Sequence, residues 1–141
     1  MKTKTAIDPI QFMDALPHGK ALGIELVALG EGTAALGLPY DLRFVGDPDT
    51  GVVHGGAISA VMDTCCGAAV MVHPDTAGIT ATIDLRIDYL RAAKPGDTII
   101  ARAECYHVTR SVAFVKAVAE DSDTATPIAT ATGTFMVGKS K

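Results

Sequence analysis

Residues 51–70 read GVVHGGAISAVMDTCCGAAV, a long apolar run that two glycines open and one carboxylate interrupts. The length and composition of this run predict a helix over residues 55–72. Asp63 lies inside the expected helix. A charge among apolar side chains strongly destabilises a fold unless it is paired, so an unpaired one is usually kept for a function. Asp63 is therefore the first candidate catalytic residue.

The expected helix is apolar on nearly every side. Ile58, Ala60 and Val70, for example, project in three different directions on a helical wheel. A helix that is hydrophobic all round is buried all round, and one curved sheet covers only part of such a helix. We therefore expect a second copy of the chain to cover the remaining side.

The start of this helix can polarise a carbonyl group. Gly55 and Gly56 leave backbone N–H groups unshielded by side chains, at the positive end of the helix dipole. Asp63 follows Gly55 by eight residues, which is about 12 Å along a helix axis. Reacting atoms must approach to roughly 3 Å. If Gly55 and Asp63 serve one reaction, they come from two antiparallel helices in different subunits.

The rest of the chain predicts an antiparallel sheet and a single domain of the α+β class over residues 1–141. Apolar periodicity and Asp8-Pro9 predict an N-terminal helix over residues 8–16, ended by Pro17. Residues 42–51 are expected to form a loop. Alternating apolar residues and turn residues predict strands at 23–29, 33–38, 79–90, 98–108, 112–120 and 130–137.

Composition excludes several functional classes. The net charge of −4, the absence of tryptophan and the lack of a basic run argue against nucleic-acid binding. The apolar run is too short and too interrupted to span a membrane, and the N-terminus lacks the apolar core of a signal peptide. Three cysteines, two of them adjacent at Cys65 and Cys66, indicate reduced thiols and a cytoplasmic protein. The four histidines are scattered, so we expect no metal site.

His54-Gly55-Gly56, with Asp63 nine residues after the histidine and a strand reading ATIDL at residues 81–85, resembles a known family. The resemblance is to hotdog-fold acyl-CoA thioesterases of the phenylacetate-pathway (PaaI-like) type, which are related to the 4-hydroxybenzoyl-CoA thioesterases. It covers residues 22–137. It implies a curved antiparallel sheet wrapped around a long central helix, and active sites at the interface of a homodimer, alone or paired into a tetramer.

The resemblance also assigns roles. Asp63 matches the catalytic carboxylate, acting as general base on water or as nucleophile. The Gly55 N–H matches the donor that polarises the thioester carbonyl, and Thr82 matches a hydroxyl that orients the water or the carboxylate. The position of His54 at the helix start, beside two glycines, predicts either a structural residue that holds the loop through a ring hydrogen bond or a general base. The substrate is an acyl-CoA, and no separate cofactor is expected.

Coenzyme A is anionic at its nucleotide end, so cations near the site are expected. The candidate substrate- and CoA-binding residues are Gly56, Arg91, Lys94, Arg110 and Ser111. Members of the family often carry Asn or Gln six residues before the histidine. This chain has Pro48 there, which cannot donate a hydrogen bond, so either Asp47 or Asp49 takes this role or the role is absent.

Two other functions remain open from the sequence. A hotdog dehydratase or hydratase acts on related acyl thioesters but pairs a catalytic histidine with the acid. A non-catalytic module would bind acyl-CoA without turnover, and the retention of Asp63 argues against it. Assays of 3-hydroxyacyl and 2-enoyl thioesters, beside thioester hydrolysis, distinguish these possibilities.

Overall fold

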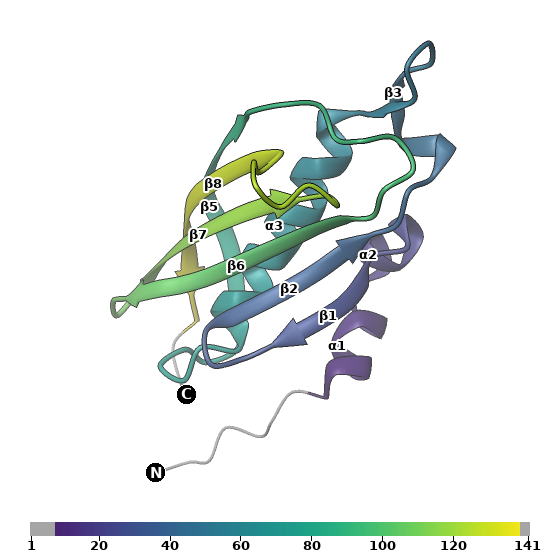
Figure 1. Cartoon of the computed structure of the whole chain (residues 1–141). Helices are drawn as coiled ribbons and strands as arrows, with labels where there is room; N and C mark the ends of the chain where they lie inside the picture. The colour runs from purple at the N-terminus through teal and green to yellow at the C-terminus, as the bar shows by residue number, and fades with distance from the viewer. Residues whose placement is uncertain (1–7, 139–141) are drawn as a thin grey trace.

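The computed structural model describes residues 8–138, in which a curved antiparallel sheet wraps around one long helix (Figure 1). Residues 1–7, which belong to the segment assessed for a signal peptide, lie outside the described residues. The helices are α1 (Pro9–Asp14), α2 (Pro17–Leu22) and α3 (Gly55–Met71), with a 3-10 turn at Leu42–Phe44. The strands are β1 (Glu25–Leu29), β2 (Thr33–Leu38), β3 (Val45–Asp47), β4 (Val52–Val53), β5 (Thr80–Tyr89), β6 (Ile99–Val108), β7 (Val112–Glu120) and β8 (Ala129–Val137).

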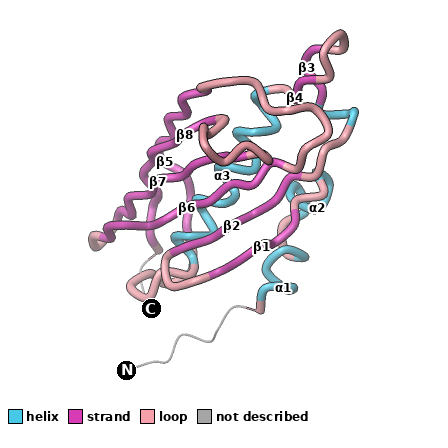
Figure 2. Tube along the Cα trace, viewed as in Figure 1, coloured by secondary structure: helices cyan, strands magenta, loops and turns pink. Residues whose placement is uncertain are grey.

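Strand order confirms the expected α+β class and hotdog arrangement. Within the described residues the main sheet runs β1-β2-β6-β7-β8-β5, and every neighbouring pair is antiparallel. The strands lie on one side of α3, while α1 and α2 lie beside β1 (Figures 1 and 2). A separate ribbon, β3-β4, leads into the start of α3.

The side of α3 that faces the sheet forms the core. Val61, Met62, Cys65 and Cys66 are fully buried against alternate residues of the strands, such as Leu36. The opposite side is a stripe of half-buried residues. We call this the open face of α3, and it consists of Ala60, Asp63, Thr64, Gly67 and Met71. The sheet therefore covers only part of the helix, as its all-round hydrophobicity predicted.

Strand β5 forms one edge of the sheet and pairs only with β8 among the described strands. Two of its large apolar side chains are exposed: Ile83 is 59% exposed and Tyr89 is 51% exposed. A long edge strand with exposed apolar residues is a template for pairing with another chain. The geometry of β5 thus agrees with an assembly in which this edge is covered.

Two segments differ from the sequence-based expectation. Pro17 does not end the N-terminal helical region but begins α2, because the fixed φ of proline and its missing N–H suit a first helical position. Gly23 ends α2 in the left-handed region, with φ of 71°. The expected loop over residues 42–51 contains the 3-10 turn and strand β3, whose partner β4 follows directly.

No helix within residues 8–138 is long and apolar enough to cross a membrane.

Candidate active site

Asp63 and Thr82 meet between α3 and β5. Asp63 is half-buried on the open face of α3, and its Oδ1 accepts a hydrogen bond of 2.7 Å from the Thr82 hydroxyl. Thr82 pairs with Phe135, which is buried on the helix-facing side of β8. This contact fixes the direction of the Asp63 carboxylate, and it brings together two residues that the sequence analysis placed in one site.

A β-bulge makes that contact possible. Strict alternation along β5 would put Thr82 on the opposite face from Leu85, because the two are three residues apart. The register shifts between Thr82 and Asp84, leaving Ile83 as the extra residue. Thr82 and Leu85 consequently both face α3.

Asp63 opens into a cavity of about 280 Å³. The cavity has α3 as its floor, the start of β5 as one wall, and the connection between α1 and α2 as the other. Its described lining includes Phe12, Leu16, His18, Asp63, Gly67, Met71, Thr80, Thr82 and Phe135. Apart from Asp63, His18 and the threonines, these groups are apolar, so the cavity suits an apolar group held next to a carboxylate.

The start of α3 is held by two side chains. The Nδ1 atom of His54 accepts a hydrogen bond of 2.8 Å from the Gly56 N–H, which caps the helix. The Tyr89 hydroxyl donates to the Gly55 carbonyl at 3.0 Å. Both groups belong to the single peptide unit between Gly55 and Gly56. Hydrogen bonds to its N–H and to its carbonyl therefore both hold that peptide in place.

The Gly55 N–H is the backbone donor left without an acceptor at the start of α3, among the described residues. No group within residues 8–138 accepts a hydrogen bond from the Gly55 N–H. The Gly56 N–H, expected to contact substrate, is already occupied by His54. A Cβ atom on Gly55 would lie 3.3 Å from the Tyr89 ring, and one on Gly56 would lie 2.9 Å from Nδ1 of His54. A Cβ atom on Gly56 would therefore displace the His54 ring, whereas one on Gly55 needs only a slight shift of the exposed Tyr89 ring.

The helix start opens into a second cavity, of about 420 Å³. Its described lining includes His18, Arg43, Phe44, His54, Gly56 and Ala60, but not Asp63. Because α3 is continuous from Gly55 to Met71, Gly55 and Asp63 stay about 12 Å apart along its axis. In one chain the Gly55 donor and the Asp63 carboxylate are therefore two separate half-sites.

The side chain of Arg91 is bound within the chain by an ion pair and by hydrogen bonds. Its guanidinium makes a bidentate ion pair with Asp121, whose side chain is fully buried, and donates its remaining N–H groups to backbone carbonyls of residues 92, 123 and 126. All five of its N–H groups are thus used within the chain. We therefore assign Arg91 to holding the β5–β6 connection against the β7–β8 connection, and not to coenzyme A.

The other expected CoA contacts lie at opposite ends of the sheet. Lys94 is exposed in the connection after β5, and its backbone N–H donates a hydrogen bond to the Asp121 carboxylate. Arg110 and Ser111 are exposed in the β6–β7 turn, where the Ser111 carbonyl accepts from the Val137 N–H at the end of β8. One chain alone does not bring these cations together.

The cysteines of α3 are unsuited to nucleophilic catalysis. Burial raises the pKa of the Cys65 thiol to about 12, and its Sγ contacts the carbonyl oxygens of Ala34 and Ala101. Burial also raises the pKa of Cys66. Since the thiolate is the reactive form, both behave as small core residues. No group of three or more potential metal ligands occurs within residues 8–138.

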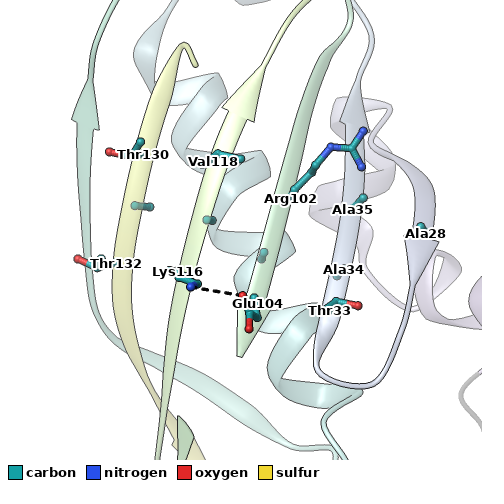
Figure 3. Close-up of a pocket in the computed structure, with 13 residues that line it drawn as sticks. Ala28, Thr33, Ala34, Ala35, Arg102, Glu104, Lys116, Val118, Thr130 and Thr132 are labelled. Atoms are coloured by element: carbon teal, nitrogen blue, oxygen red, sulfur yellow. Dashed lines mark ion pairs between the residues drawn. The ribbon is translucent and has the colours of Figure 1, made fainter. Parts of the chain in front are cut away.

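A larger cavity, about 580 Å³, lies on the other face of the sheet (Figure 3). Small residues such as Ala35 and Thr130 line it, and Arg102, Glu104 and Lys116 border it, with Lys116 and Glu104 ion-paired at 3.5 Å. These side chains point away from α3, whereas Ala101 and Ala103 point toward it. The cavity is separated from Asp63 by the sheet.

Three residues of the two half-sites were not identified from the sequence. His18 lines both cavities, Arg43 lines the cavity at the helix start, and Tyr89 holds the Gly55 carbonyl. His18 and Arg43 lie on segments expected to be turn or loop. Tyr89 ends an alternating strand, and a period-2 pattern does not show which distant backbone group such a side chain meets.

Comparisons with known proteins identify relatives of the chain. A family model described as "Thioesterase superfamily" matches residues 50–128. The medium/long-chain acyl-CoA thioesterase YigI of Escherichia coli is 30% identical over 140 residues, which cover 90% of this chain and 89% of that protein. A protein of Pseudomonas aeruginosa has a similar crystal structure, with a TM-score of 0.78, 44% identity, and coverage of 91% of this chain and 95% of that one. The Escherichia coli PaaI protein, at 20% identity, has the same fold, with a TM-score of 0.82 over 94% of this chain and 91% of that chain.

Proposed function

The chain belongs to the thioesterase superfamily, and on that basis we propose that it hydrolyses acyl-CoA thioesters at a site shared by two copies of the chain. Family membership and the relationship to an acyl-CoA thioesterase support thioester hydrolysis. The residues of α3 support the shared site. We propose Asp63 as the catalytic carboxylate and the Gly55 N–H as the donor to the carbonyl oxygen.

The observation that carries the proposal is the separation of the two half-sites. Asp63 and the Gly55 N–H lie on one continuous helix, about 12 Å apart along the axis. Asp63 borders one cavity, while His54 and Gly56, on either side of Gly55, border another. The donor must lie about 3 Å from the carbonyl oxygen, and the carboxylate must reach the carbonyl carbon directly or through one water molecule. Two antiparallel copies of α3 satisfy this requirement, because each helix start then lies beside the partner's Asp63.

Two surfaces favour such a pair. Between Gly55 and Asp63 the half-buried residues of α3 are small, and they allow a second helix to approach closely; they are Ala57, Ser59 and Ala60. The adjacent edge of β5 exposes Ile83 and Tyr89. A two-fold axis would bring the same surfaces of both copies together, as isologous dimers require.

The proposed reaction proceeds through a tetrahedral intermediate. As general base, Asp63 takes a proton from water, whose oxygen bonds to the thioester carbon. The Gly55 N–H and the dipole of α3 stabilise the negative charge that develops on the carbonyl oxygen. The carbon–sulfur bond then breaks, and the CoA thiolate recovers the proton. As nucleophile, a carboxylate oxygen of Asp63 would instead bond to the thioester carbon, and the carbon–sulfur bond would break with release of the CoA thiolate. Water would then hydrolyse the resulting mixed anhydride and protonate the thiolate.

The position of Thr82 fits both routes. Its hydroxyl donates to Asp63 Oδ1, with 2.7 Å between the two oxygen atoms. The Thr82 oxygen therefore retains lone pairs that can accept a hydrogen bond from water. Lys94, Arg110 and Ser111 remain our proposed contacts for coenzyme A. An antiparallel pair would bring the Lys94 end of one chain toward the Arg110 end of its partner.

Hydrolysis of a panel of acyl-CoAs, followed by release of free thiol, tests the function directly. Replacing Asp63 with Asn should lower kcat by about 10²–10⁴-fold, the usual effect of removing a general base. Asp84→Asn is the matched control, because Asp84 lies two residues after Thr82 on β5 but is exposed. A loss below about tenfold in Asp63→Asn would overturn the role of Asp63.

The same panel tests the other functions. Turnover of 3-hydroxyacyl- or 2-enoyl-CoA without hydrolysis would indicate a dehydratase or hydratase. Tight binding of acyl-CoAs without any turnover would indicate a binding module. Either result would contradict the proposed thioesterase.

A further inference from the structure

The cavity beside Asp63 contains a glycine that the fold does not require. Asp63, Gly67 and Met71 are spaced four residues apart, so they lie in line on the open face of α3, and all three line the cavity. Glycine destabilises a helix interior relative to alanine. Gly67 is not among the glycines with positive φ, so its backbone conformation suits any residue.

Packing does not require glycine at this position either. A Cβ atom on Gly67 would lie 3.9 Å from Cγ2 of Thr80 and 4.0 Å from Cε1 of Phe135, which are ordinary contacts. At Gly55 and Gly56, by contrast, the added atom would lie 3.3 Å and 2.9 Å from a neighbouring side chain. The missing side chain of Gly67 therefore serves to leave the cavity open between Asp63 and Met71.

We propose that Gly67 is the specificity-determining residue for acyl-chain length: its missing side chain lets an acyl tail run along α3 from Asp63 to Met71. This inference rests on the proposed thioesterase function and specifies the substrate of the same site. The tail lies against the groups opposite Gly67, which include the Thr80 methyl group and the Phe135 ring. Phe12 and Leu16, on the α1 side, supply further apolar contacts.

The dimensions of the cavity define the class of acyl group. Met71 follows Asp63 by eight residues, about 12 Å along the helix. The cavity volume of about 280 Å³ accommodates nine or so groups of the size of a water molecule, at about 30 Å³ each. A linear acyl chain of medium length fills that space, with its thioester carbon at Asp63 and its terminal methyl group near Met71.

The proposed partner helix leaves this part of the cavity free. If Asp63 of one chain faces the partner's Gly55, the two antiparallel helices cross near Ser59. Gly67 then lies beyond the start of the partner's helix. Leu16 and Pro17, where α2 begins in the same chain, also line this cavity.

The experiment measures kcat/KM for saturated acyl-CoAs from two to sixteen carbons. Gly67→Leu should lower the ratio of octanoyl-CoA to acetyl-CoA hydrolysis at least tenfold, because a side chain in an apolar pocket discriminates by about 10–200-fold per methylene. Gly67→Ala should shift the optimum in the same direction by a smaller amount. Met71→Ala should shift it toward longer chains.

Using the ratio between two substrates cancels differences in the amount of folded enzyme. Ala28→Leu is the matched control, because it adds the same side chain on the exposed side of β1 and should leave the ratio unchanged. An unchanged chain-length profile in Gly67→Leu overturns the role of Gly67 while leaving the thioesterase intact. Absence of hydrolysis of every acyl-CoA by the unaltered protein overturns the proposed function itself.

Discussion

At the scale of single residues, the proposed mechanism depends on how one peptide unit is oriented. The donor proposed for the carbonyl oxygen is a backbone N–H, so side chains act on it only by positioning Gly55. His54 and Tyr89 hold the next peptide from its two ends, at 2.8 and 3.0 Å. The sequence analysis correctly placed His54 at the start of the helix, because His54 directly precedes the two glycines. Tyr89 is 34 residues away from Gly55, and only the fold brings them together.

Removing the Tyr89 hydroxyl should therefore slow the reaction without weakening substrate binding. A single net hydrogen bond contributes about 1 kcal/mol, so Tyr89→Phe should lower kcat roughly fivefold and leave KM close to its original value. Steady-state kinetics with one acyl-CoA measures both constants. Tyr106→Phe, an exposed tyrosine elsewhere on the sheet, should change neither. An unchanged kcat in Tyr89→Phe, or a change in KM alone, would contradict the positioning role.

At the scale of elements, periodicity predicted the long helix and the long strands well. The expected helix over residues 55–72 is α3 at Gly55–Met71, and the expected strand over residues 79–90 is β5 at Thr80–Tyr89. Two short elements, α2 and β3, were missed: α2 begins with Pro-His-Gly, a turn signal in the sequence, and the three residues of β3 are too few to show a period. The bulge at Ile83 was also missed. The alternating pattern of β5 continues past it, and only pairing with β8 reveals the extra residue.

The two long connections at one end of the sheet are joined by Arg91 and Asp121, and this ion pair makes stability depend on pH. Hydrogen bonds from the Arg91 guanidinium hold the pKa of the Asp121 carboxyl well below its usual range. A carboxyl whose pKa is lower in the folded than in the unfolded chain stabilises the fold above its unfolded pKa, near 4. That contribution is lost as the pH falls toward the folded pKa.

Asp121→Asn should lower the Tm by several degrees at pH 7 and reduce the loss of stability between pH 5 and pH 3. Thermal unfolding followed by circular dichroism at each pH measures both effects. Asp88→Asn is a suitable control, because Asp88 forms an exposed pair with Arg86, and exposed pairs contribute little. If the two variants have the same Tm and the same acid dependence, the connection between Arg91 and Asp121 does not stabilise the fold as described.

At the scale of the whole molecule, the chain is half of the proposed catalytic unit. The open face of α3, the exposed edge of β5 and the separation of Gly55 from Asp63 all point to a second copy. The sequence already predicted this arrangement, because helix geometry alone places the two groups about 12 Å apart. The separate cavities, and the opposite positions of Lys94 and Arg110, became visible only in the structure.

Mixing two inactive variants tests the shared site most directly. Asp63→Asn removes the carboxylate, and Gly55→Pro removes the donor. Proline suits this first helical position, because His54 before it is extended, with ψ of 139°. Each hybrid dimer contains one intact site and one doubly altered site. Random pairing of two equally abundant variants should therefore restore about a quarter of the activity of the unaltered protein.

Native mass spectrometry should first confirm that hybrid dimers form and that both variants fold. Activity should then rise on mixing, in proportion to the hybrid fraction, while each variant alone remains inactive. Two inactive variants that form hybrid dimers without regaining activity would contradict the shared site, and so would full activity of Gly55→Pro by itself.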